Sequence, residues 1–219
     1  MWRLPLSRRI PHGEFDYLAL VTALGDYRRP RDRITTLLRE GAIVRVKKGL
    51  YVFGESERRG PVHPEILANL IYGPSYVSLE YALQRHGLVP ERVETVTSVT
   101  ICRSRVFSTP LGRFTYRTAP TAAFRPGVER VELEPGRACL LAVPEKALAD
   151  KLHADTVALR TRRDVQAYLE EDLRIDPAAI GSLRSTLLAD YAERYRSRKL
   201  RLLASLVARL QRSGGQSHA

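Results

Sequence analysis

The chain has 219 residues, which is enough for one large domain or two small ones. Hydrophobic residues make up 44% and charged residues 27%, as in folded globular proteins, and no apolar run reaches the roughly 18 residues of a membrane span. Lys and Arg number 36 against 24 Asp and Glu, so the formal charge is +12 and the sequence pI is about 10.1; this excess points to nucleic acid or an anionic surface as partner.

The remaining global features exclude several classes of protein. The two cysteines, Cys102 and Cys139, cannot build a disulfide framework or a four-cysteine zinc site. The first nine residues lack the apolar core of a secretory signal. We therefore expect a cytoplasmic location.

The positive charge is concentrated in two segments. Residues 26–48 hold eight Lys or Arg against three acids, and residues 194–212 hold seven Lys or Arg and no acid. Such clustering favours a binding surface over a general aid to solubility.

The front of the chain predicts two helices followed by a hairpin. Helical spacing of apolar residues predicts a helix over 14–24, ended by Gly25, and a second over 30–40, begun by Pro30 and ended by Gly41. Alternating β-branched residues predict strands over 42–46 and 50–53, joined by a turn at 47–49. This order of elements is that of a minimal winged helix-turn-helix.

The apolar residues of the second helix, Ile34, Leu37 and Leu38, predict that its opposite face is open to a partner. A DNA major groove admits one helix and offers acceptors on guanine and donors on cytosine and adenine. We therefore expect the helix, its approach and the wing to supply the DNA-binding residues, which are Arg28, Arg29, Arg31, Arg33, Thr36, Arg39, Lys47 and Lys48. Asp32 either caps the helix or accepts from a cytosine amino group, with capping favoured.

A polar stretch at 54–61 predicts a linker, so we expect a DNA-binding domain over 1–55, a linker over 56–61 and a larger domain over 62–219. In the larger domain the pattern predicts helices over 63–71, 78–86, 145–153, 163–172, 177–188 and 189–211, strands over 95–101, 112–118 and 137–143, and a disordered tail from Ser213 to Ala219. The expected fold class is α+β, with a small sheet and C-terminal helices.

Several short segments of the sequence resemble the AbiEi family of antitoxins. They are PRDRITTLLREG at 30–41, RVKKGLYVF at 45–53, LANLIYGPSYVSLEYAL at 67–83, TSVT at 97–100, TPLGRFTY at 109–116 and PEKALADK at 144–151. Their order along residues 14–155 carries the resemblance. Residues from about 156 to 219 are not part of the resemblance.

The resemblance implies the antitoxin of a type IV toxin–antitoxin pair linked to abortive phage infection. Such a protein represses its own promoter by binding inverted repeats in double-stranded DNA. It also counteracts a nucleotidyltransferase toxin without forming a stable complex with it. Only helix 30–40 and the turn Lys47-Lys48-Gly49 take a role by position, and no cofactor, metal or catalytic residue is implied.

Two alternatives remain from the residues alone. A metal-dependent nuclease would use Glu132 and Glu134, which lie on one side of an extended segment, although an acidic turn before Pro135 and Gly136 explains them better. A direct toxin-binding module would carry a vestigial winged helix. The basic cluster at 194–212 is either a solvated face or an additional nucleic-acid contact.

Overall fold

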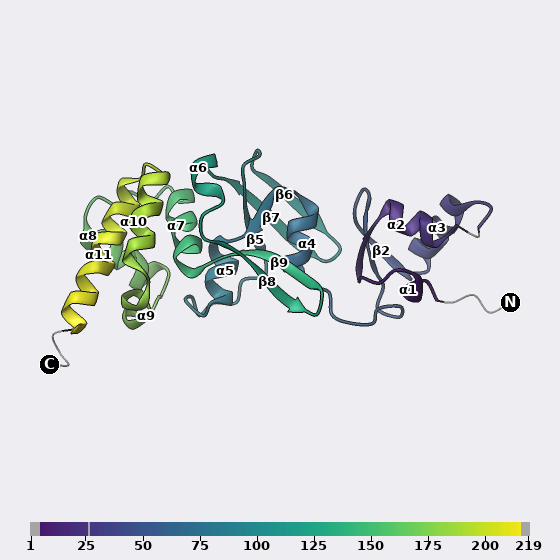
Figure 1. Cartoon of the computed structure of the whole chain (residues 1–219), viewed down its shortest axis with the longest axis horizontal. Coiled ribbons are helices and arrows are strands. Elements are labelled where there is room, and N and C mark those ends of the chain that lie inside the picture. The colour runs from purple at the N-terminus through teal and green to yellow at the C-terminus, as the bar shows by residue number, and fades with distance from the viewer. Residues whose placement is uncertain (1–4, 26, 216–219) are drawn as a thin grey trace.

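The computed structural model describes residues 5–25 and 27–215, and it confirms the α+β class. The chain is elongated, with a front unit (residues 5–55), a central sheet with its covering helices, and a bundle of C-terminal helices following one another along the long axis (Figure 1). No helix within the described ranges is both long and apolar enough to cross a membrane.

The front unit consists of three helices and a three-stranded sheet. Its elements are α1 (Leu6–Arg9), β1 (Glu14–Asp16), α2 (Tyr17–Ala23), α3 (Pro30–Arg39), β2 (Ile43–Lys47) and β3 (Leu50–Phe53). The strands are antiparallel in the order β1-β3-β2. The helix predicted over 14–24 is wrong at its start, because residues 14–16 pair with β3 as a strand and the Asp16 carboxylate then caps α2 by accepting from the Ala19 amide at 2.7 Å.

Helix α3 forms where the sequence predicts it. Pro30 occupies the first turn, where its missing N–H costs nothing, and the chain leaves the helix at Gly41, whose φ of +70° suits glycine. Ile34 and Leu37 are buried in a core shared with α2 and the sheet. The remaining faces of α3 are therefore polar and outward.

The sheet of the front unit is buried on both faces. Tyr51 and Phe53 pack on the helix side, whereas Val46, Leu50 and Val52 belong to the larger core that includes Ile71 and the central sheet. In Figure 1, β2 accordingly lies between the α2–α3 pair and the rest of the molecule. The front unit is thus docked through the back of its hairpin.

The rear part of the chain (residues 62–215) begins with a six-stranded mixed sheet in the order β6-β7-β5-β4-β9-β8. The strands are β4 (Ser75–Val77), β5 (Val96–Thr100), β6 (Arg105–Thr109), β7 (Gly112–Thr118), β8 (Val128–Glu134) and β9 (Arg137–Ala142). The helices of this region are α4 (Pro64–Ile71), α5 (Leu79–Arg85), α6 (Thr121–Phe124) and α7 (Pro144–Ala154).

Three strands of this sheet have no counterpart in the sequence-based assignment. β4 is three residues long and β6 is an exposed edge, so neither gives a strong alternating pattern. β8 includes Glu132 and Glu134, so the acidic turn expected there is a strand and the turn is at Pro135 and Gly136. The strand predicted over 95–101 ends at Thr100, and Cys102 lies in the bend that follows, where its amide donates to Thr100 Oγ1.

The C-terminal region is helical, with different boundaries from those predicted. It contains α8 (Arg162–Ala167), a π-helical turn η1 (Tyr168–Asp172), α9 (Pro177–Ser182), α10 (Ser185–Arg194) and α11 (Arg198–Gly215). The predicted junction at 188–189 lies inside α10, and the real junctions are at Leu183–Arg184 and around Arg196, whose φ is +50°. α11 continues through residues 213–215, where a disordered tail was expected, and 216–219 lie outside the described residues.

A buried polar network connects the sheet, α7 and α10. Lys146 Nζ lies 2.8 Å from Asp150 Oδ1 one turn along α7, and both side chains are almost fully buried. Asp150 also accepts from Ser78 Oγ at 2.6 Å and from Tyr76 OH at 3.0 Å, while Tyr195 OH contacts both members of the ion pair. Burial lowers the pKa of the Lys146 ammonium, which the Asp150 carboxylate partly offsets. The network fixes how the C-terminal helices sit on the sheet.

Replacing Lys146 with Met should destabilise the protein by about 3 to 5 kcal/mol, because the Asp150 carboxylate would remain buried without its partner. Urea unfolding followed by circular dichroism measures this, with Lys48→Met, at an exposed position, as the control that should change stability by less than about 0.5 kcal/mol. The double variant Lys146→Met/Asp150→Leu should recover part of the loss. A loss below 1 kcal/mol for Lys146→Met would contradict the role given to this pair.

Candidate nucleic-acid interface

The outward side of α3 carries exposed arginines. Arg28 and Arg29 lead into the helix, and Arg31 and Arg39 lie at its two ends; all four are exposed in the complete chain. Because the front unit docks through the opposite side of its sheet, none of the four is covered by the rear part. The position of α3 at the outer end of the molecule leaves this face open (Figure 1).

A shallow hollow lies beside the start of α3. It is lined by Tyr27, Arg28, Arg29, Asp32, Arg33 and Thr36, six residues that come from the connector and the first two turns of the helix. Three of them are arginines and one is an acid, so the hollow is net positive. A concave cationic surface of this kind suits the phosphodiester backbone at a groove edge.

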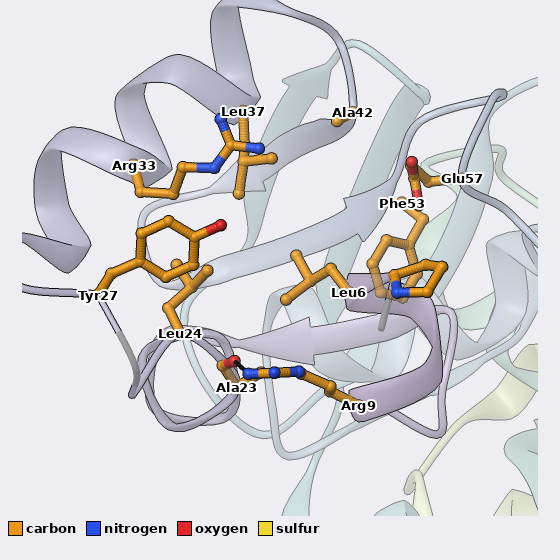
Figure 2. A pocket seen from close by; sticks show the side chains of 11 residues that line it. Leu6, Arg9, Ala23, Leu24, Tyr27, Arg33, Leu37, Ala42, Phe53 and Glu57 are labelled. Carbon is orange, nitrogen blue, oxygen red and sulfur yellow. Dashed lines mark hydrogen bonds between the residues drawn. The ribbon is translucent and has the colours of Figure 1, made fainter. Parts of the chain in front are cut away.

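Arg33 has a different setting from the other arginines of α3. It is half-buried, its Nη1 lies 3.5 Å from Glu40 Oε2, and its guanidinium lies 5.8 Å from the centre of the Tyr27 ring. Figure 2 shows Arg33 and Tyr27 close together on one side of a pocket of about 280 Å³ that Leu24, Leu37 and Phe53 also line. Arg33 therefore contributes to the packing of α3 as well as to its charge.

Asp32 and Thr36 are oriented by local contacts. No side chain caps the start of α3, where Arg29 is the N-cap residue, so the expectation that Asp32 caps the helix is wrong. The Asp32 carboxylate instead lies 3.9 Å from Arg29 Nη1 in the first turn, which suits the positive end of the helix dipole. Thr36 Oγ1 donates to the Asp32 carbonyl at 3.1 Å, and Thr35 does the same to Arg31.

The two lysines of the hairpin turn differ. Lys48 is exposed, whereas Lys47 is half-buried and its Nζ donates to the carbonyl of Ile71 at the end of α4. Burial lowers the pKa of the Lys47 ammonium. The expectation that both lysines project toward a partner therefore needs correction for Lys47, which holds the hairpin on α4.

A β-bulge explains the inward position of Lys47. Arg45 pairs with Tyr51, and the register then slips so that Lys47 pairs with Leu50. Since opposite residues of an antiparallel pair share a face, Lys47 falls on the side of Leu50, which faces the rear part.

The same register places Arg45 on the helix side with Tyr51, where it is exposed. The predicted DNA-binding residues leave out Arg45, because it lies inside a predicted strand and outside the predicted helix and turn. The alternation from Ile43 to Arg45 does place both on one face, and that signal could have found it.

The carboxylates of the nuclease alternative are engaged in structural contacts. Glu132 Oε1 accepts from the Gly136 amide at 2.7 Å, closing the β8–β9 turn. Glu134 contacts Arg137 and lies 3.2 Å from His63 Nε2, and hydrogen bonds from these two residues lower the pKa of its carboxyl. Residues 5–25 and 27–215 hold no group of three or more His, Cys, Asp or Glu side chains arranged to bind a metal ion.

Comparison with known proteins adds no family assignment. The chain matches no protein-family model, and a search of curated proteins finds no match.

Arg137 joins the front unit to the rear part and should be important for stability. Its guanidinium contacts Glu14 of β1 and Glu134 of β8, and the Glu14 side chain is only 4% exposed. Arg137→Gln should cost about 3 kcal/mol in chemical unfolding, because the Glu14 carboxylate loses its buried partner. Arg130→Gln, at an exposed position of β8, is the matched control, and equal effects of the two changes would count against this contact.

Proposed function

We propose that this chain is a sequence-specific DNA-binding repressor whose front unit acts as a winged helix-turn-helix. The observation that carries the proposal is the arginine-rich outward face of α3, which stays exposed while Ile34 and Leu37 anchor the opposite face. In this proposal α3 enters a major groove, Arg28, Arg29, Arg31 and Arg39 contact guanine edges or phosphates, and Thr36 lies within reach of the bases.

The hairpin has a divided role in this proposal. Arg45, on the helix side of β2, and Lys48, in the hairpin turn, are exposed cations that would meet the phosphate backbone. Lys47 stabilises the docked position of the hairpin instead. Arg33 helps to set the position of the helix through Glu40 and Tyr27 and adds charge at the hollow.

We further propose that the protein is the antitoxin of a type IV toxin–antitoxin pair and represses the promoter of that pair. The support is the resemblance of residues 14–155 to AbiEi antitoxins. The functional partner is then a nucleotidyltransferase toxin, counteracted without a stable complex, and the operator is an inverted repeat upstream of the gene. Co-expression with the product of the adjacent gene tests this part, since growth inhibition by that product should be relieved by the full chain.

The reading face is tested by replacing Arg29 and Arg39 with Ala. Each lost contact to a guanine or phosphate should cost about 1 to 3 kcal/mol, so the double variant should bind the upstream duplex at least tenfold more weakly in a gel shift. The matched control is Arg92→Ala/Arg113→Ala, which removes the same charge from exposed sites in the rear part. Unchanged binding by Arg29→Ala/Arg39→Ala would show that α3 does not read the operator.

The two turn lysines provide an internal comparison. Lys48→Gln should reduce the slope of log affinity against log salt by about 0.9, the value for one phosphate contact on duplex DNA. Lys47→Gln should leave that slope unchanged, because its ammonium is engaged with the Ile71 carbonyl, and should instead lower thermal stability. If Lys47→Gln alone reduced the slope of log affinity against log salt, the docking of the hairpin on α4 through Lys47 would be contradicted.

A further inference from the structure

A second cationic surface lies on the C-terminal helices, far from α3. On α11 the exposed side chains Arg198, Arg201, Ser205, Arg209 and Arg212 recur three or four residues apart. At 3.6 residues per turn they fall within about 80° of arc and extend over about 21 Å. Leu200, Leu203 and Val207 are fully buried on the other side, so this face is held outward by the packing of the bundle.

The start of α8 extends this surface. Arg162 Nη1 donates to Ser205 Oγ at 3.4 Å, in the gap between Arg201 and Arg209. Arg198 Nη2 donates to the carbonyl of Arg160 at 3.5 Å, which places Arg160 at the start of the row. We call these residues the C-terminal arginine stripe: Arg160, Arg162, Arg198, Arg201, Arg209 and Arg212.

Few carboxylates offset the stripe. Glu193 lies 3.6 Å from Arg201, and the Asp164 carboxylate accepts the backbone amides of Arg160 and Thr161. Six arginines against these two acids leave a net charge of +4. Lys199, which belongs to the same basic run of the sequence, turns inward and donates to the Asp155 carbonyl at 2.6 Å, so the stripe is made of arginines alone.

We propose that the C-terminal arginine stripe binds the phosphodiester backbone of double-stranded DNA without sequence preference. A duplex presents about one negative charge per 1.7 Å of its axis, so a row of arginines along about 21 Å of helix can face many phosphates. Guanidinium groups match phosphate oxygens with two parallel hydrogen bonds. The stripe and α3 lie at opposite ends of the molecule (Figure 1), so the stripe contacts DNA outside the segment that α3 would read.

The test uses the full chain and a fluorescein-labelled 25-base-pair duplex of random sequence, with binding followed by anisotropy at several salt concentrations. The variant Arg198→Gln/Arg201→Gln/Arg209→Gln/Arg212→Gln should bind at least tenfold more weakly at 0.1 M salt. The slope of log affinity against log salt should fall by about 3 to 4, at about 0.9 for each lost phosphate contact.

Two controls separate the stripe from net charge and from misfolding. Arg92→Gln/Arg103→Gln/Arg113→Gln/Arg117→Gln removes four charges from exposed positions elsewhere and should bind within twofold of the parent. The four stripe arginines changed to Lys keep the charge and should retain most of the affinity.

Equal losses in the stripe and control variants, or no loss in either, would overturn the proposal. So would an unchanged affinity for the duplex together with a loss of binding to a single-stranded RNA probe. The variant Arg29→Ala/Arg39→Ala leaves the stripe intact. This variant should therefore still bind the random duplex, whether or not α3 reads an operator. The two proposals can therefore fail separately.

Discussion

The arrangement of the molecule depends on the burial of one small sheet from both sides. Tyr51 and Phe53 attach the helices of the front unit to one face, and Val46, Leu50 and Val52 attach the other face to the central sheet. Each buried side chain of this size contributes about 1.5 to 3 kcal/mol, so a handful of them fixes the two parts against each other. Both faces of this sheet are covered, one by the apolar side of α3 and the other by the rear part. The polar side of α3 therefore faces outward.

Polar contacts reinforce this docking at both ends of the hairpin. Lys47 holds the turn on the Ile71 carbonyl, and Arg137 holds the start of β1 through Glu14. The partners of each contact are far apart in the sequence, which makes the docking specific rather than merely apolar. The proposed reading helix and the proposed stripe are consequently carried on one body, at its two ends (Figure 1).

The parts of the fold that sequence reasoning predicted are those encoded by local patterns. Helix α3 was bounded by Pro30 and Gly41, and the hairpin by alternating residues around Gly49, so both could be assigned within a residue or two. Strand β1 was hidden because Phe15 lies at helical spacing from Leu18, and only its pairing with β3 reveals it as a strand. β4 is three residues long and pairs with strands distant in sequence. β6 pairs with the adjacent β7, but it is an exposed edge strand with no fully buried residue and so gives no clear alternation.

Of the candidate site, the sequence predicted the exposed arginines of α3 but not the orientation of the hairpin residues. The exposed arginines around α3 follow from the apolar spacing of Ile34 and Leu37, which any helical wheel reproduces. The inward position of Lys47 depends on a bulge, and a one-residue change of register reverses which face a side chain takes. The outward position of Arg45 precedes the bulge and follows from the alternation that begins at Ile43. The basic run at 194–212 is a similar case. Only the packing of α11 shows that Lys199 turns inward while the arginines of the stripe face outward.

The central claim is that the outward face of α3 lodges in a groove of duplex DNA. Amide hydrogen exchange, followed by mass spectrometry with and without the upstream duplex, tests it most directly. With the duplex bound, exchange should be slower in peptides covering residues 28–40 and the turn that contains Lys48, and unchanged in the peptides of α4 and β9. Protection confined to the central sheet, with α3 exchanging as it does in the unbound protein, would contradict it.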